Sequence, residues 1–513
     1  MKEFESIAEY KPVIGFEIHV QLNTKSKMFG RAANNPDQSV PNTDIDEVNT
    51  GQPGTLPVAN KEAIRLAAMV GLALNCTIDE WSKFDRKHYF YPDLPKGYQI
   101  SQYDQPISKN GWLDIEIFPS NPSPRSGRGP SLSREGAASA GSPPAKGEYS
   151  AQAEGGGLIK RIGITRAHLE EDAGKNIHPE GLPYSLVDYN RAGAPLLEIV
   201  TEPEIESAEE AGAFLTELRN IIRYLGASSC DMEKGTMRVE PNISVRKPGE
   251  TTLPKYKVEV KNINSIKFAQ AAIDYEIARQ TEILKEGGTP KQVTMGWNEK
   301  EGKTVEQRSK EEANDYRYFP DPDLPVLQFT KAYLDDLRNR MPELPAQKRE
   351  RFITEYNLPA AVVENLINWK ELAAFFEDVV SEIREWKLVD IDGNWEINSV
   401  IKQAANWALG EFSAVLNANH QKPSDSRVDA ENFAELLKMI HKGEISGSAA
   451  KQVFKVMFEK GGDPSNIVED LGLKQVSDES AISAAVDAII AANPKAVSDY
   501  KAGEQKSFGF LVG

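Results

Sequence analysis

The strongest constraint on the fold is a change in the spacing of apolar residues near residue 342. Before it, several short segments alternate apolar and polar residues with a period of two, which is typical of β-strands. The clearest is residues 16–22, Phe-Glu-Ile-His-Val-Gln-Leu. After it, apolar residues recur with helical spacing and strand patterns almost disappear. The sequence therefore predicts an α/β (α+β) domain with a mixed or antiparallel sheet over residues 1–341, followed by all-α regions.

The all-α region is expected to form two domains, because the polar stretch 422–427 interrupts its helical pattern. We predict a helical domain at 342–427 and a tail domain at 428–513, which gives a chain of 513 residues three domains in all. The last residues, Phe-Gly-Phe-Leu-Val-Gly, are apolar and lack a helix cap. We therefore expect the tail domain to be truncated at its C-terminus.

One stretch of the first domain has a different composition. Residues 121–157 are mostly Ser, Pro, Gly and Ala, with almost no large apolar side chains. Such a segment cannot bury enough surface to order itself. We predict a disordered insertion at the tip of a hairpin formed by residues 112–118 and 158–165, with no role in function.

Bulk properties exclude several classes of protein. No run of 18 apolar residues is present, and the N-terminus lacks a signal-peptide core, so we expect a cytoplasmic protein with no membrane contact. The two cysteines, Cys76 and Cys230, have no metal-binding or redox spacing and are expected to be buried thiols. The net charge of −17 means that only a local basic surface would bind nucleic acid.

The polar face of the strand at residues 16–22 is the first candidate site. Glu17 and His19 lie two residues apart on one face, close enough to share a metal ion. An ordinary amphipathic strand is the alternative. Further acids, Glu171, Glu198, Glu240 and Glu259, lie on separate predicted elements. A divalent cation would join these acids with least strain, and Mg²⁺ suits carboxylates and substrate phosphates.

Two alternatives stay open for these acids. They could form salt bridges with Arg161, Arg238 or Lys257 instead of binding a metal. The identity of a metal also stays open, because the imidazole of His19 favours softer cations than Mg²⁺.

Residues 83–103 combine four cations with tyrosines and glutamines. This pattern suits contacts with phosphate and ribose, although a surface loop with extended lysines would look the same. Residues 296–304 nearly match a Walker A loop, but the spacing is one residue too long and the segment is predicted to be a hairpin.

Several long motifs, in this order, resemble one family. They are residues 13–20, 83–106, 161–175, 188–202, 259–265 and 315–323, together with the tail from about 446. The chain resembles the B subunits of the aspartyl/glutamyl-tRNA(Asn/Gln) amidotransferase, the GatB/GatE family, over nearly its whole length except residues 121–157. The resemblance implies a cradle domain with a kinase-like site, a helical domain, and a YqeY-like tail that contacts tRNA.

The resemblance also implies the function. The substrates would be mischarged Glu-tRNA(Gln) or Asp-tRNA(Asn), whose side-chain carboxylate is phosphorylated by ATP and then amidated. Ammonia would come from glutamine through a glutaminase, the A subunit, and a small C subunit would complete a heterotrimer. The cofactors implied are ATP and Mg²⁺. Some relatives bind zinc through four cysteines in the loop before Leu56, but this loop has no cysteine, so we expect no zinc.

The family's site residues map onto this chain one by one. The implied metal ligands are Glu17, His19, Glu171, Glu240 and Glu259, of which all but Glu240 are also expected to be catalytic. We expect phosphate contacts with ATP from basic side chains, namely Lys83, Arg86, Lys87, Lys261 and Arg317.

Two other functions compete with this interpretation. The chain could be a non-catalytic tRNA-binding scaffold with purely structural acids, or a lone metal-dependent phosphatase or nuclease. ATP use that depends on mischarged tRNA would separate them.

Overall fold

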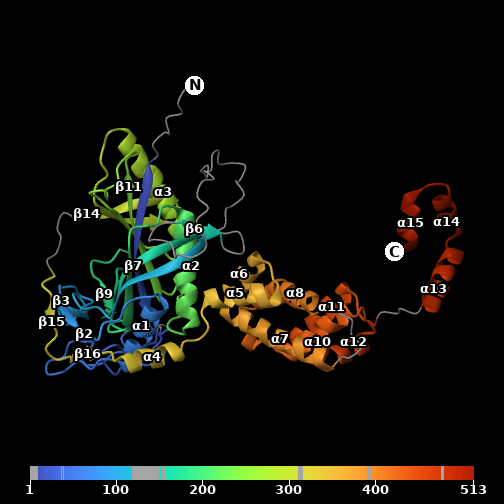
Figure 1. Cartoon of the computed structure of the whole chain (residues 1–513), viewed down its shortest axis with the longest axis horizontal. Coiled ribbons are helices and arrows are strands. Elements are labelled where there is room, and N and C mark those ends of the chain that lie inside the picture. The colour runs from blue at the N-terminus through green and yellow to red at the C-terminus, as the bar shows by residue number, and fades with distance from the viewer. Residues whose placement is uncertain are drawn as a thin grey trace. The chain divides into compact units, whose positions relative to one another are not determined.

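A computed structural model describes residues 10–35, 37–38, 40–117, 149–152, 158–179, 181–309, 316–389, 396–474 and 479–512. The chain divides into two compact units, Met1–Arg349 and Glu350–Gly513 (Figure 1). The boundary lies close to the predicted change at residue 342. Helix α5, Pro345–Tyr356, runs through it.

The first unit contains a nine-stranded mixed sheet, as predicted. Eight strands follow the order β14-β13-β12-β11-β1-β10-β7-β5, and β6 pairs with β7. Every pair is antiparallel except β12 with β13. The strands are β1 Lys11–Gln21, β5 Ser108–Ile117, β6 Tyr149–Gln152, β7 Leu158–Glu171, β10 Pro195–Thr201, β11 Met237–Arg246, β12 Val258–Lys261, β13 Val293–Asn298 and β14 Lys303–Ser309.

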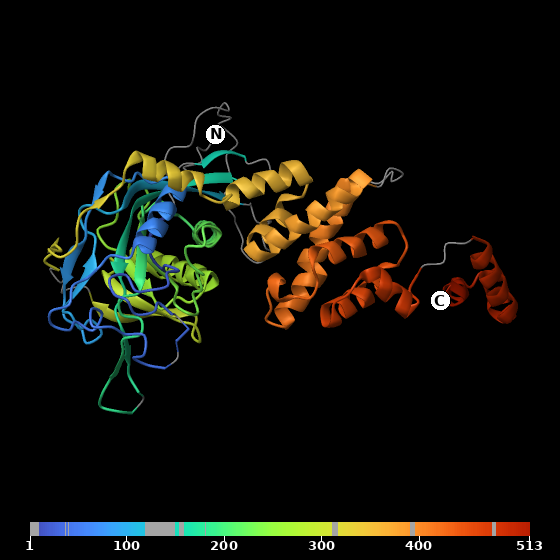
Figure 2. The same cartoon turned by 90° about the horizontal axis from the view of Figure 1, so that it is seen from below.

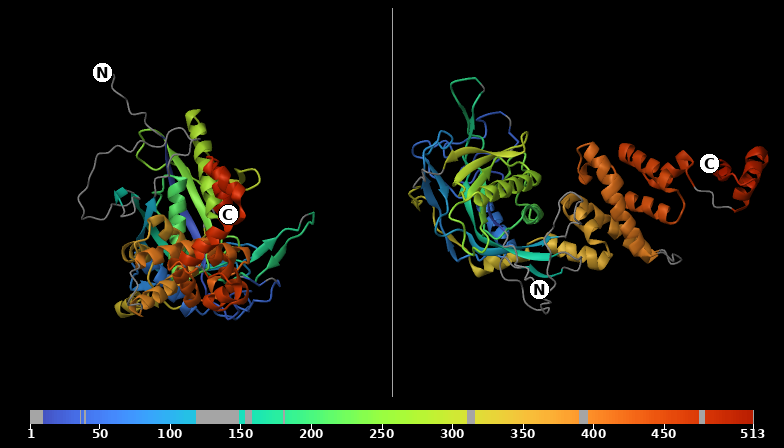
Figure 3. Two further views of the ribbon diagram at one scale, coloured as in Figure 1. Left: turned by 90° about the vertical axis from the view of Figure 1, so that its right-hand side faces the viewer. Right: turned by 90° about the horizontal axis from the view of Figure 1, so that it is seen from above.

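Three small sheets accompany it. One has the order β15-β3-β4, with β3 at Asp85–His88, β4 at Tyr98–Ser101 and β15 at Phe319–Pro320. A second pairs β2, Trp81–Ser82, with β16, Leu327–Gln328. The third is the hairpin of β8, Lys175–Ile177, and β9, Leu186–Asp188, which projects from the body of the unit (Figures 2 and 3).

Three helices cover the apolar face of the large sheet, namely α1 Lys61–Ala73, α2 Ala208–Tyr224 and α3 Ile266–Lys285. A fourth, α4 Lys331–Asn339, packs against α1. Helix α2 packs against α3, and both contact the sheet. Serine side chains cap the starts of α2 and α3, because Ser207 and Ser265 each accept a backbone N–H bond at the N-terminus of their helix.

Strand β1 lies near the middle of the sheet and shows the predicted alternation. Phe16, Ile18 and Val20 are buried, and the Phe16 ring stacks on Phe214 of α2 with ring centroids 6.0 Å apart. Successive side chains of a strand point to opposite faces. Glu17 and His19 therefore lie on the face away from this core.

The predicted insertion falls mostly outside the described residues. Strands β5 and β7 form the expected hairpin, with Trp112 opposite Gly163. Within 121–157, however, residues 149–152 form β6, and Tyr149 lies opposite Lys160 of β7. The prediction of disorder is therefore wrong for these four residues, because an edge strand was available for pairing.

The second unit is helical, as predicted. After α5 its helices are α6 Ala360–Ile367, α7 Lys370–Val389, α8 Ile397–Trp407, α9 Ser413–Ala418, α10 Ala430–His441, α11 Gly447–Lys460, α12 Pro464–Leu471, α13 Glu479–Ala492, α14 Pro494–Lys501 and α15 Gln505–Val512. A π-helical turn, Ala408–Phe412, joins α8 to α9. No helix of the described residues is long and apolar enough to cross a bilayer.

Aromatic packing crosses the predicted boundary at 427/428. The Phe433 ring of α10 lies 5.4 Å from Phe375 of α7, 5.7 Å from Phe412, and 6.0 Å from Phe454 of α11, between ring centroids. All four rings are largely or fully buried. The helices on either side of residue 427 therefore share one core, and the proposed separation into helical and tail domains remains a prediction.

Candidate functional site

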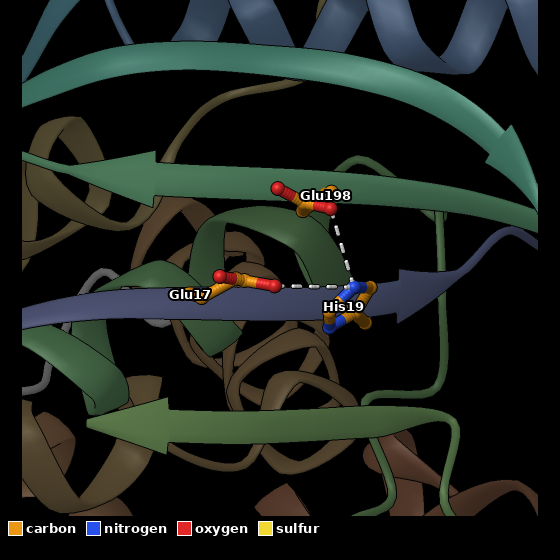
Figure 4. A group of neighbouring side chains, drawn as sticks. All are labelled: Glu17, His19 and Glu198. Atoms are coloured by element: carbon orange, nitrogen blue, oxygen red, sulfur yellow. Dashed lines mark ion pairs between the residues drawn. The ribbon is translucent and has the colours of Figure 1, made fainter. Parts of the chain in front are cut away.

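A cross-strand row of polar side chains forms the centre of the site. His19 on β1 lies directly opposite Glu198 on β10, and Glu198 lies opposite His168 on β7. The His19 Nε2 atom is 3.4 Å from a carboxylate oxygen of Glu198 and 3.9 Å from one of Glu17 (Figure 4). Directly opposite residues of an antiparallel pair share a face, so the sheet register itself brings these groups together.

Glu170 completes this arrangement. Its carboxylate oxygens lie 3.5 Å from His19 Nε2 and 3.9 Å from His168 Nε2, and His168 Nε2 is 3.5 Å from Glu198. Two groups of ligand atoms result, each within 4.8 Å of one another: Glu17, His19 and Glu198, and His168, Glu170 and Glu198. We call these five residues the His–Glu cluster.

Burial and neighbouring charges shift the pKa values of the side chains in the cluster. Burial alone would lower the pKa of His19, but the carboxylates of Glu198 and Glu170 raise it to about 9. Burial, together with the charge of Glu198, raises the pKa of Glu170 to about 7. Burial and the same neighbour also raise the pKa of Glu17. Close packing of acids thus makes their full ionisation costly without a cation.

The pKa values of His168 and Glu198 are lowered instead. Burial lowers the pKa of His168 to about 4, so its imidazole is neutral at pH 7. Burial would raise the pKa of Glu198, but His168 and His19 hold it well below its usual range. His168 Nδ1 is buried without a hydrogen-bond partner. A neutral imidazole beside an ionised carboxylate is the state in which both groups can bind a metal.

A second group of charges adjoins Glu17. Glu240 on β11 lies opposite Glu17, and Glu259 on β12 lies opposite Asn242. The Lys261 Nζ atom is 2.8 Å from a Glu240 oxygen and 3.8 Å from a Glu259 oxygen. The other Glu259 oxygen accepts a 2.9 Å hydrogen bond from Thr294 Oγ1. We call Glu240, Glu259 and Lys261 the Lys261 group.

Glu171 lies elsewhere. It follows Glu170 on β7, so its side chain points away from the face that holds Glu170. Its carboxylate is 2.7 Å from Lys96 Nζ and accepts the backbone N–H of Ile100 at 3.0 Å. The side chain is 1% exposed. The structure therefore does not bring Glu171 to the other predicted ligands but places it in a buried ion pair.

The five predicted nucleotide-binding cations also separate. Lys87 faces the cluster: burial would lower its pKa, but Glu170 and other neighbours raise it. Lys261 lies beside Glu240. Lys83 pairs with Asp85 and Asp104, and Arg86 pairs with Asp321 and Asp323 at 2.8 Å each. Arg317 is exposed in a turn with φ of +42°. Only Lys87 and Lys261 are thus placed beside the acids.

The salt-bridge alternative holds for part of the acid set. Three of the proposed ligands are paired: Glu171 with Lys96, and both Glu240 and Glu259 with Lys261. Two of the cations named for this role have other ion-pair partners, since Arg161 pairs with Asp114 and Arg238 with Asp172.

The cluster fits a divalent cation. Carboxylates dominate its donor set, which suits hard cations such as Mg²⁺ or Mn²⁺, while the imidazoles also permit borderline metals. Burial, and then repulsion from Glu198, raise the pKa values of Glu17 and Glu170, and a bound cation would favour the ionised form of both. The residues that would hold it are either Glu17, His19 and Glu198 or His168, Glu170 and Glu198.

Sequence reasoning missed His168 and Glu170 as ligands and passed over Glu198. The missing signal was the alternation in Arg166-Ala167-His168-Leu169-Glu170. Ala167 and Leu169 are buried in the core, so His168 and Glu170 have to share the polar face.

Comparison with known proteins gives two family matches. Residues 12–335 match the model described as the GatB/GatE catalytic domain, and residues 395–513 match the one described as the GatB domain. The chain belongs to the GatB/GatE family. Every residue of the His–Glu cluster and of the Lys261 group lies inside the catalytic-domain match. The second match begins upstream of residue 428, within the helices that share the aromatic core with α10.

Curated members of the GatB/GatE family are similar along nearly the full chain. The B subunit of the aspartyl/glutamyl-tRNA(Asn/Gln) amidotransferase from Caldanaerobacter subterraneus subsp. tengcongensis is 45% identical over 505 residues, covering 98% of this chain and 94% of the relative. The protein of the same name from Persephonella marina is 45% identical, covering 98% and 95%. That from Bacillus velezensis is 43% identical, covering 98% and 94%.

Proposed function

We propose that this chain is the B subunit of an aspartyl/glutamyl-tRNA(Asn/Gln) amidotransferase and carries its ATP-dependent ligase site. The substrate is Glu-tRNA(Gln) or Asp-tRNA(Asn), and the site activates the side-chain carboxylate for amidation. The observation that carries the proposal is the buried His–Glu cluster, which lies within a match to the family's catalytic domain. A scaffold protein would have no use for five interacting titratable groups whose burial is costly.

The reaction has two steps. A carboxylate oxygen of the acyl group attacks the γ-phosphorus of ATP, and the bond to the β-phosphate bridging oxygen breaks to release ADP. Ammonia then attacks the carbonyl carbon of the acyl phosphate and phosphate leaves, which yields the amide. Such transfers depend on positioning and charge neutralisation more than on covalent help from protein.

The chain's own side chains divide this work. Lys261, between Glu240 and Glu259, would contact phosphate oxygens on the β11–β12 side of the site. Lys87, which interacts with Glu170 and Glu198, would contact the substrate carboxylate on the β7–β10 side. A divalent cation in the His–Glu cluster would neutralise the charge of the transferring phosphoryl group.

The proposal includes partners. Ammonia is to be supplied from glutamine by a glutaminase, the A subunit, and a small C subunit completes a cytoplasmic heterotrimer. Neither cysteine of this chain suits a glutaminase nucleophile, because both thiols are buried and burial raises the pKa of Cys230 to about 12. We propose ATP and Mg²⁺ as cofactors and no zinc.

The test is amidation by the assembled heterotrimer with Glu259→Gln, using mischarged tRNA, ATP and glutamine. We expect amidation to fall by about a hundredfold or more, while glutamine hydrolysis by the partner continues. Glu299→Gln is the matched control, because Glu299 is an exposed acid in the β13–β14 turn. Normal amidation by Glu259→Gln would show that the Lys261 group is outside the site.

A further inference from the structure

Four tyrosines form a row of ring contacts, and two of them, Tyr89 and Tyr318, interact with Glu170 of the His–Glu cluster. Tyr103 stacks on Tyr318 with ring centroids 4.4 Å apart and an interplanar angle of 11°. Tyr318 meets Tyr316 edge-on at 6.4 Å, and Tyr316 meets Tyr89 edge-on at 5.8 Å. We call these four residues the tyrosine wall. They come from the segment after β3, the segment after β4 and the segment before β15.

Lys87 connects the tyrosine wall to the cluster. Its Nζ lies 4.9 Å from the Tyr316 ring centroid and 5.8 Å from that of Tyr89, and it also bonds the Tyr318 hydroxyl. The same ammonium interacts with Glu170 and Glu198. A ligand stacked on the tyrosine wall would therefore lie near Lys87, which interacts with Glu170 and Glu198 of the His–Glu cluster.

Tyr103 is built as a platform at the outer end of the wall. Its side chain is 62% exposed although one ring face is covered by Tyr318, so the opposite face is turned to solvent. Its backbone N–H is fixed by a 2.9 Å bond to the buried carboxylate of Asp85. A fixed, stacked and exposed aromatic ring offers a surface on which a nucleobase can stack.

The two sides of the site differ in chemistry. The Lys261 group lies on β11 and β12, on one side of β1, whereas Lys87 interacts with residues of β7 and β10 on the other. Acids that hold a cation suit a triphosphate. The tyrosine wall supplies aromatic rings, which suit an unpaired base. Lys87 beside it supplies one ammonium, which suits the carboxylate of the attached acyl group.

We propose that Tyr103 stacks on the base of the 3′-terminal adenosine of the substrate tRNA, which positions the acyl carboxylate beside Lys87. This inference rests on the proposed function, because that function makes an aminoacylated 3′ end the second substrate. Tyr103 is a binding residue, and Tyr318 acts through it as a positioning residue.

The test measures binding of the assembled heterotrimer to labelled, deacylated tRNA by fluorescence anisotropy, without ATP. Intact tRNA is compared with tRNA trimmed of its terminal adenosine. We expect the wild-type complex to prefer intact tRNA by about tenfold, as one base stacked on one ring provides. Tyr103→Ala should abolish the preference, and Tyr103→Phe should keep it. Tyr184→Ala, an equally exposed tyrosine between β8 and β9, is the control and should also keep it.

A second measurement shows whether the base stacked on Tyr103 belongs to tRNA or to ATP. Steady-state amidation by Tyr103→Ala should show a KM for mischarged tRNA raised about tenfold and an unchanged KM for ATP. If the preference for intact tRNA survives in Tyr103→Ala, or if the KM for ATP rises instead, the assignment to the terminal adenosine is wrong. A wild-type complex that binds both tRNAs as expected but never amidates would refute the proposed function and leave this contact standing.

Discussion

Glu198→Gln should weaken metal binding, whereas Glu171→Gln should leave metal binding intact and lower the stability of the fold. Both residues are buried acids on neighbouring strands. Glu198 lies between the imidazoles of His19 and His168 at 3.4 and 3.5 Å, in both groups of potential ligands. Glu171 is in an ion pair with Lys96. Replacing each carboxylate by an amide of the same shape removes one charge and little volume.

The structure sets the magnitudes. Residues that only hydrogen-bond to a metal ligand typically change metal affinity about 10–100-fold when they are mutated. Loss of Glu198, a direct ligand in this proposal, should therefore weaken metal binding at least about a hundredfold. For Glu171→Gln we expect no such loss. Glu171→Gln should instead lower the free energy of unfolding, because the buried Lys96 charge loses its counter-charge. We expect a loss of about 3 kcal/mol, at the low end for a broken buried pair, because the amide oxygen still accepts the Ile100 N–H. That free energy lowers the melting temperature by ~4 °C in a unit of this size.

The assay is calorimetric titration with Mn²⁺ together with thermal denaturation in EDTA, on the same two variants. Glu299→Gln again controls for loss of a surface acid. The reasoning is refuted if Glu171→Gln loses Mn²⁺ affinity as completely as Glu198→Gln does. Glu171 would then be a ligand, and the alternation of β7 would not decide which acids meet.

Three more predictions concern stability. Lys160→Met should lower the free energy of unfolding by about 3–5 kcal/mol in chemical denaturation, because Glu210, 2.8 Å from this fully buried lysine, loses its counter-charge; adding Glu210→Gln should recover part of the loss. Burial lowers the pKa of Lys27 from 10.5 to about 8, so between these pH values the unfolded chain holds a proton that the folded chain lacks. Stability relative to Lys27→Met should therefore rise with pH across this range, by about 3 kcal/mol in all, and a flat difference would contradict the shift. Deleting residues 121–148 while keeping β6 should leave the melting temperature within ~1 °C, and a large fall would show that this segment packs on the fold.

Local patterns predicted the elements of this fold well. The alternation of residues 16–22 placed Glu17 and His19 on one face of a buried strand, and Ser207 and Ser265 marked the starts of two helices. These signals depend on chain neighbours only, so they can be read without knowing the fold.

The composition of the site depended on pairings between distant residues. No local pattern indicates that Glu198 lies opposite His19 while Arg238 lies on its other side. Glu171 was proposed as a ligand from the family resemblance, and this role remains a prediction; strand geometry turns its side chain to the face opposite that of Glu170. The contact of Phe433 with Phe375 across residue 427 was not predicted, because it joins distant parts of the chain.

The register of β1 also governs when this site comes into being during synthesis. His19 leaves the ribosome long before Glu198, and Glu17 long before Glu240 and Glu259. Until those later strands align on both flanks of β1, the nascent polypeptide has no ordered place for a cation or a phosphoryl donor. A slip of one position would turn Phe16 and Ile18 outward in place of Glu17 and His19. Immature or misaligned molecules therefore lack the assembled His–Glu cluster.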